Sequence, residues 1–193
     1  MGGLTARTYP VRLRTMASLP PFPKRYTAEM VCSNGDRKML YVDGFNMRME
    51  EFPKTGAPTI LISRMDKRVI WSLSTSTKTY SQTRMPDAME RAFKPDTLYD
   101  WTEDGMETIG GRRCRRFVGR YREARGLVGD AHEVCFVDAR TGMRRRRDSH
   151  DVNGKLVATI DYLNAKVGPP PRQVFEMPEG YKRGYHRRKR VVS

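Results

Sequence analysis

Long apolar runs are missing from this sequence of 193 residues. No window approaches the roughly 18 consecutive apolar residues that a membrane-spanning helix needs. The longest aliphatic stretches, such as Thr59–Ser63, have the length of a β-strand. Hydrophobic residues make up 38% of the chain and are spread along most of it, which argues against global disorder. The length suits one domain with a sizeable core.

Histidine and cysteine are scarce, which limits the chemistry that the sequence offers. The three cysteines, Cys32, Cys114 and Cys135, include no pair two to four residues apart, so no zinc-site spacing is present. No Gly-x-Ser-x-Gly elbow and no glycine-rich phosphate loop occur. We therefore expect no metal, no cofactor and no catalytic residue. Cys114 and Cys135 fall on consecutive predicted strands, where a disulfide and burial as small hydrophobic side chains both fit.

Acidic residues are absent from the first 28 positions, which hold five basic residues and four prolines. This segment has no apolar h-region and so does not have the pattern of a secretory signal. An organellar transit segment, or upstream sequence ahead of an alternative start at Met16, fits the same composition. We expect residues 1–24 to form a basic, proline-containing, disordered arm.

Positive charge dominates the chain, with a formal net charge of +15. It is concentrated in Arg112–Arg125 with +6, Arg140–Asp148 with +4 and the tail Lys182–Ser193 with +6. Concentrated positive potential attracts nucleic acid, anionic lipid headgroups and acidic proteins, and a solvated basic face is the alternative interpretation. The candidates for contact with an anionic partner are Arg112, Arg113, Arg115, Arg116, Arg144, Arg145, Arg146, Arg147, Arg187, Arg188, Lys189 and Arg190.

Apolar and polar side chains alternate along most of the chain after the arm. The period of two residues is typical of half-buried strands, and turn signals such as Asn34-Gly35 and Asp43-Gly44 separate the runs. Strands are predicted at 26–32, 38–42, 45–51, 59–64, 68–74, 78–83, 112–121, 132–138, 143–149 and 156–166. Short strands at this spacing predict an all-β sheet or an incomplete barrel of roughly seven to eleven strands.

Two segments between the strands have other patterns. Pro86-Asp87 opens a predicted helix, Ala88–Phe93, since proline is favoured at a helix start. An acidic cluster follows, without the spacing of an EF-hand, and we interpret it as a solvated loop. Its members are Asp100, Glu103, Asp104 and Glu107.

Several strand-and-turn motifs follow one another in a recognisable order. They are Asp43-Gly44 with Asn46, Arg48 and Glu50; Thr59-Ile60-Leu61-Ile62 with Arg64, Asp66 and Lys67; Val69, Trp71 and Leu73; Tyr80; Gly105, Glu107, Thr108, Ile109 and Gly110 before Cys114; Asp138, Thr141 and Gly142; and Phe175, Pro178, Gly180 and Tyr181. This order resembles the LolA/LolB-like fold of bacterial outer-membrane lipoprotein carriers, and in particular the uncharacterised LolA-like families, over about residues 25–182. The missing secretory signal and the basic tail at 183–193 depart from the family pattern.

The resemblance implies a mainly β domain over residues 25–182. Its core would be a single strongly curved antiparallel sheet, with one or two helices covering the concave face, and in the carriers this face holds acyl chains. The twelve methionines fit such a groove, because flexible thioethers suit adaptable apolar surfaces. Candidates to line the groove, with ordinary core as the alternative for each, are Ile60, Ile62, Val69, Trp71, Leu73 and Tyr80.

The function that we expect is therefore that of a binding protein rather than an enzyme. Its ligand would be apolar or amphipathic, a lipid or a lipid-modified protein. The resemblance implies a periplasmic or envelope-associated location and a role in outer-membrane biogenesis; a cytoplasmic or organellar location is the alternative. An arginine-rich subunit that binds nucleic acid or another anionic partner is the first alternative function. An enzyme with a cavity site, as in the similarly folded violacein-pathway protein VioE, is the second.

The run of four arginines at 144–147 constrains the position of its strand. Alternation sends Arg144 and Arg146 to one face and Arg145 and Arg147 to the other, and burying unpaired guanidinium groups is very costly. We expect this strand to lie at the edge of the sheet, where charge also blocks unwanted strand pairing. Acidic partners within the sheet, or an anionic ligand, are the alternatives.

Overall fold

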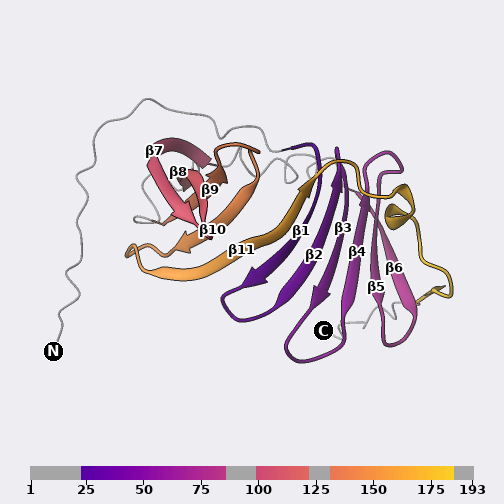
Figure 1. Cartoon of the computed structure of the whole chain (residues 1–193). Helices are drawn as coiled ribbons and strands as arrows, with labels where there is room; N and C mark the ends of the chain where they lie inside the picture. Colours follow the sequence, from indigo (N-terminus) through magenta and orange to yellow (C-terminus); the bar gives the residue numbers. More distant parts are fainter. Residues whose placement is uncertain (1–22, 86–98, 122–130, 185–193) are drawn as a thin grey trace.

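The computed structural model describes residues 23–85, 99–121 and 131–184, which form one 12-stranded sheet (Figure 1). Its strands are β1 (Arg25–Cys32), β2 (Arg37–Asp43), β3 (Asn46–Phe52), β4 (Thr59–Arg64), β5 (Val69–Ser74), β6 (Thr79–Arg84), β7 (Tyr99–Ile109), β8 (Arg112–Tyr121), β9 (His132–Asp138), β10 (Arg144–His150), β11 (Leu156–Val167) and β12 (Lys182–Arg183). The order across the sheet is β12-β6-β5-β4-β3-β2-β1-β11-β10-β9-β8-β7. All neighbours are antiparallel except β12, which pairs in parallel with β6.

The sheet is strongly curved and is not closed into a barrel, because β12 and β7 lie at its two opposite edges (Figure 1). The expected fold class, a mainly β domain with one strongly curved, mostly antiparallel sheet, is thus confirmed. The sheet has 12 strands, more than the seven to eleven expected, and the described residues include no helix that covers a face in the way that was expected. The only helical element in the part of the chain that the structure describes is η3, a 3-10 turn at Arg172–Phe175. The helix expected at Ala88–Phe93 lies outside the described residues.

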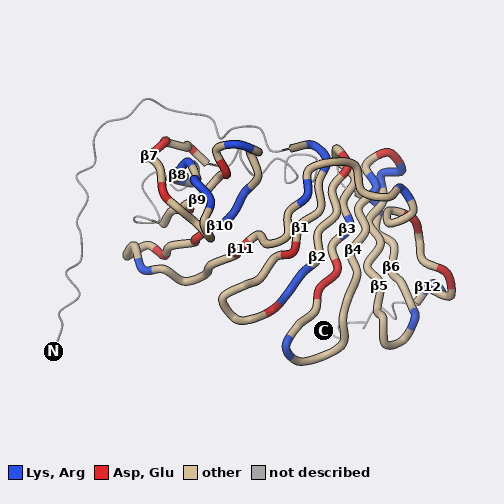
Figure 2. The backbone as a smooth tube through the Cα atoms, in the orientation of Figure 1, with Lys and Arg blue, Asp and Glu red and all other residues tan. Residues whose placement is uncertain are grey.

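Two strands were missing from the sequence-based prediction, β7 and the two-residue β12. The interpretation of the acidic cluster as a solvated loop was wrong, because its residues belong to β7. Acidic positions of β7 lie beside basic positions of β8 (Figure 2). Arg115 donates to Glu103 with 2.6 Å between Nη2 and Oε2, and Arg116 pairs with Asp104. Charge pairing across the hairpin takes the place of the apolar alternation that would have revealed the strand.

The prediction that the arginine-rich strand lies at the sheet edge was also wrong. This strand, β10, lies inside the sheet between β9 and β11. Acidic side chains on the flanking segments meet three of its arginines, and an aromatic ring meets the fourth. The partners are Asp138 for Arg145 at 3.3 Å, Asp161 for Arg146 at 2.8 Å, Glu133 for Arg147 at 2.5 Å, and Tyr162 for Arg144, whose guanidinium carbon lies 5.8 Å from the ring centre.

The strand registers assign each side chain to one of two faces, because directly paired residues point the same way. The face that we call the Met49 face carries a row in which each residue is paired with the next: Ala28, Leu40, Met49, Leu61, Ser72 and Ser81. The opposite face, the Trp71 face, carries the corresponding row Tyr41, Arg48, Ile62, Trp71 and Gln82.

Buried clusters lie on both faces of the part of the sheet formed by β7–β9. Trp101, Phe117, Cys135 and Val137 pack together on one face, and Cys114, Val134 and Phe136 pack on the other. Cys114 is paired with Asp138 and Cys135 with Phe117, so the two thiols point to opposite faces. All three cysteines are free thiols. Of the two interpretations, burial as small hydrophobic side chains is therefore correct for this pair.

Candidate functional site

The six groove candidates from the sequence come together on the Trp71 face. Ile60 is paired with Leu73, which is paired with Tyr80, and Ile62 is paired with Trp71. Val69 shares the parity of Trp71 along β5. Sequence alternation thus grouped these side chains correctly, although they come from three strands.

Within this group, the two most central side chains belong to the core. Ile62 is 0% exposed and Leu73 is 1% exposed. The turn η3 is held over β3 and β4 on the same face, since Arg48 donates to the carbonyl of Val174 at 3.1 Å and Arg64 donates to that of Phe175 at 3.2 Å. The remaining four side chains are half-buried, and their role as ligand contacts stays a prediction.

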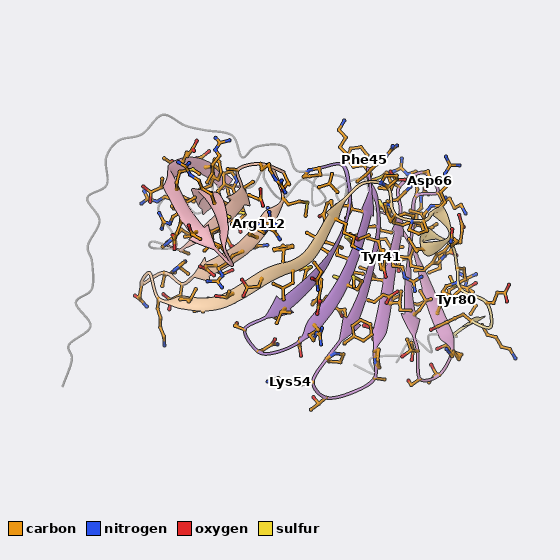
Figure 3. All side chains as sticks on the ribbon, in the orientation of Figure 1. Tyr41, Phe45, Lys54, Asp66, Tyr80 and Arg112 are labelled. Atoms are coloured by element: carbon orange, nitrogen blue, oxygen red, sulfur yellow. The ribbon has the colours of Figure 1, made fainter. Side chains whose placement is uncertain are left out.

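Arg64, which lies on β4 beside η3, forms two ion pairs. Its guanidinium group pairs with Asp66 at 2.6 Å and with Glu176 at 2.5 Å. The hydrogen bond from Arg64 lowers the pKa of Asp66, and Arg64 together with Lys67 lowers the pKa of Glu176. These contacts fasten the C-terminal segment to the β4–β5 turn, where Figure 3 labels Asp66.

The Met49 face over β1–β5 carries an apolar surface that the sequence analysis did not single out. The side chains of this surface are half-buried. Ala28, Leu40 and Ser63 on the same face are buried, and Met30 also packs against the buried cluster of Ala28, Met143 and Tyr162. The 3-10 turn lies on the Trp71 face, so within the described ranges no helical element covers this surface. We call it the methionine strip, and it consists of Met30, Met47, Met49, Leu61 and Ile70.

The same face becomes polar toward the sheet edge at β6 and β12. An open pocket of about 300 Å³ lies there, and we call it the hydroxyl pocket. Five hydroxyl side chains and one glycine line it: Thr59, Ser72, Ser74, Thr79, Ser81 and Gly184. The alternation rule could have placed these hydroxyls on one face with Met49, but the pocket depends on β12, which the sequence pattern did not predict.

The candidates for an anionic partner do not form one free basic surface in the described part of the chain. Five of the eight that the structure describes are paired with carboxylates, namely Arg115, Arg116, Arg145, Arg146 and Arg147. Arg112 and Arg113 are exposed at the start of β8. Arg187, Arg188, Lys189 and Arg190 lie outside the described residues. Most of the charge in β8 and β10 is therefore neutralised within the sheet.

Two histidines that are distant in sequence are stacked across β9 and β10. His132 is paired with His150, and their ring centres lie 4.4 Å apart with planes 5° from parallel. Burial, and after it the neighbouring His132, lowers the pKa of His150. In residues 23–85, 99–121 and 131–184, no three His, Cys, Asp or Glu side chains are grouped so that they could hold a metal ion. The described helical segments include none that is long and apolar enough to cross a membrane.

Comparison with solved structures gives several proteins of similar fold. An uncharacterised conserved protein from Thermus thermophilus matches with a TM-score of 0.62 at 13% identity, covering 84% of this chain and 90% of that one. MucB, in the MucA/MucB complex from Pseudomonas aeruginosa, matches with a TM-score of 0.50 at 15% identity, covering 80% of this chain and 56% of that one. A LolA superfamily protein from Nitrosomonas europaea matches with a TM-score of 0.35 at 11% identity, covering 81% of this chain and 92% of that one.

These identities are low, so the likeness is one of fold. The chain spans little more than half the length of MucB. No protein-family model matches the sequence, and no curated protein matches it. The curved, mainly β fold expected from the ordered motifs is shared with the first two of these structures.

Proposed function

We propose that this chain is a binding protein for an amphipathic ligand, a lipid or the lipid portion of a modified protein. The observation that supports this proposal most strongly is the methionine strip. A curved sheet that leaves an apolar surface half-exposed on one face offers a place for an alkyl chain. Methionine side chains adapt to an irregular chain because they have three rotatable bonds and a polarisable sulfur.

The proposal places the alkyl chain on the Met49 face rather than on the Trp71 face. On the Trp71 face, Ile62 and Leu73 are already enclosed, and η3 is fixed over β3 and β4 by Arg48 and Arg64. A ligand over β3 and β4 on that face would have to displace those hydrogen bonds. On the Met49 face, an alkyl chain would cover apolar area that is still partly in contact with water, at a gain of about 25 cal/mol per Å².

A titration with the neutral fluorescent probe N-phenyl-1-naphthylamine tests this proposal. Met49→Lys places a charge in the strip, because Met49 is half-buried between Leu40 and Leu61. Met39→Lys is the matched control, because Met39 is also half-buried but lies on β2 between Glu29 and Glu50 on the Trp71 face. We expect Met49→Lys to weaken probe binding at least about tenfold, since desolvating an ammonium group is costly.

The control variant should bind the probe as the unchanged protein does. Equal losses in the two variants, while both still unfold cooperatively, would contradict the assignment to the Met49 face. No probe binding by the unchanged protein would contradict the proposed function itself.

The envelope location implied by the motif resemblance remains part of the proposal. It is supported by the kind of ligand that the strip fits, since lipids and lipid-modified proteins are concentrated there. Fractionation of cells that produce the full-length protein tests it directly, with recovery in the cytosol as the contradicting result.

A further inference from the structure

The Met49 face changes in polarity in an ordered way from β1 to β6. The central row runs from Ala28 and Leu40 through Met49 and Leu61 to Ser72 and Ser81. Along this row, the change from apolar to hydroxyl side chains therefore occurs between Leu61 on β4 and Ser72 on β5. A molecule lying across this face would meet apolar groups at one end and hydroxyl groups at the other.

The hydroxyl pocket lies at the polar end of this row. Leu73 and Tyr80 also line it, and the strand register places both on the Trp71 side of their strands. Tyr80 is labelled in Figure 3 near the end of the sheet where β12 joins β6.

Two of the lining hydroxyls are available to a ligand. Ser72 and Ser81 lie directly opposite each other, and the described residues provide no hydrogen-bond partner for either hydroxyl. The other hydroxyls take part in local hydrogen bonds: Thr59 donates to Glu51 at 3.2 Å, and Thr79 lies 2.7 Å from the hydroxyl of Thr77. A hydroxyl group both donates and accepts, so the pair matches ligand groups that do the same.

Among the described residues, no Lys, Arg, Asp or Glu lines the pocket. Glu51 is nearby, but its charge is paired with Lys38 at 2.5 Å. Lys182 is opposite Thr79 on the edge strand, is exposed and does not line the pocket. Sites that select phosphate or carboxylate groups use charge-assisted hydrogen bonds from such cations. The lining of this pocket lacks them.

We propose that the hydroxyl pocket binds an uncharged, polyhydroxylated head group, such as a sugar or glycerol group, attached to the alkyl chain on the methionine strip. This inference rests on the proposed function, because the strip must hold the chain. It extends that function by naming the class of head group and the two serines that recognise it.

Binding of ligands that share one dodecyl chain tests the inference, measured by displacement of the fluorescent probe below the critical micelle concentrations. Dodecyl maltoside has an uncharged hydroxylated head group, dodecylphosphocholine a zwitterionic one and laurate an anionic one. We expect the maltoside to bind about tenfold more tightly than the other two, since two or more hydrogen bonds of ordinary strength give a factor of this order. Free maltose should bind far more weakly than the maltoside.

The double variant Ser72→Ala/Ser81→Ala should remove this preference and leave laurate binding unchanged. Thr83→Ala is the matched control, because Thr83 shares the strand and face of Ser81 but does not line the pocket. The control should keep the preference. Equal affinity for the head groups, a preference for laurate, a preference unchanged in the serine variant, or maltose binding as tight as that of the maltoside would overturn this inference alone. Failure of all dodecyl ligands to bind would overturn the proposed function as well.

Discussion

Arg147 on β10 donates to Glu133 on β9, with 2.5 Å between Nε and Oε2, inside the sheet. Glu133 also accepts hydrogen bonds from the hydroxyl of Ser149, at 3.0 and 3.1 Å. The Glu133 side chain is only 11% exposed and that of Arg147 is 32% exposed. The arginine-rich strand is therefore stabilised by its own acidic partners, which explains how it occupies an interior position.

This pairing predicts that Glu133→Gln destabilises the fold by about 2 kcal/mol or more, because it leaves a partly buried guanidinium group without its counter-charge. Arg113→Gln is the matched control for loss of one charge, since Arg113 is exposed, and it should change the stability by less than about 0.5 kcal/mol. Urea unfolding of both variants measures the difference. Equal small effects would show that the ion pair contributes little.

The stacked histidines predict a pH dependence of stability. Burial and His132 lower the pKa of His150, against the opposing effects of Asp148 and Glu133, while Arg116 acts in the same direction as His132. The unfolded chain then binds a proton more readily than the folded chain, so stability falls as the pH drops below the ordinary histidine pKa of about 6.5. Unfolding between pH 7 and pH 5 should show this fall, and His150→Phe should reduce it. A slope unchanged in the variant contradicts the assignment.

Gly119 on β8 is the position where the core tolerates no side chain. It is paired with Trp101, and a Cβ atom added at Gly119 would lie 2.6 Å from the indole ring. Gly119→Ala should therefore destabilise the fold by about 1–3 kcal/mol, the usual cost of overpacking. Trp101→Leu should reduce the additional cost of the alanine, so the double-mutant cycle tests the contact. Additive losses would mean that the two positions do not interact.

Ser63 on β4 has a hydroxyl that is fully buried on the Met49 face and has no hydrogen-bond partner in the described part of the chain. A buried hydroxyl without a partner costs about 1–3 kcal/mol, so Ser63→Ala should leave thermal stability equal or raise it. A marked loss of stability in this variant would show that the hydroxyl is satisfied in solution.

Much of the sheet could be predicted from sequence because alternation and turn signals are local. β4, β8 and β9 have the predicted bounds, and the six apolar candidates share a face as alternation requires. The predictions that failed concern two strands, β7 and β10, whose charged side chains are paired with residues on neighbouring strands. β7 is stabilised by arginines on β8, and β10 is stabilised by acids on β9 and β11. No pattern within a single strand reveals such a partner.

The candidate site was only partly predictable for the same reason. Alternation separates Met47 and Met49 from Arg48, but it does not show which face the C-terminal turn covers. That choice depends on the hydrogen bonds of Arg48 and Arg64 to a segment more than a hundred residues away. The hydroxyl pocket likewise needs the pairing of β12 with β6, which two residues of sequence do not indicate.

Photo-crosslinking with a dodecyl maltoside that carries a diazirine at the end of its chain tests the central claim most directly, because it locates the bound alkyl chain. Peptide mapping by mass spectrometry then identifies the labelled residues. The methionine strip predicts labels on β1, β3 and β4 at Met30, Met47, Met49 or Leu61, and competition by unlabelled maltoside should remove them. Competable labels on the Trp71 face, at Ile60, Trp71 or Tyr80, would contradict the proposed binding surface.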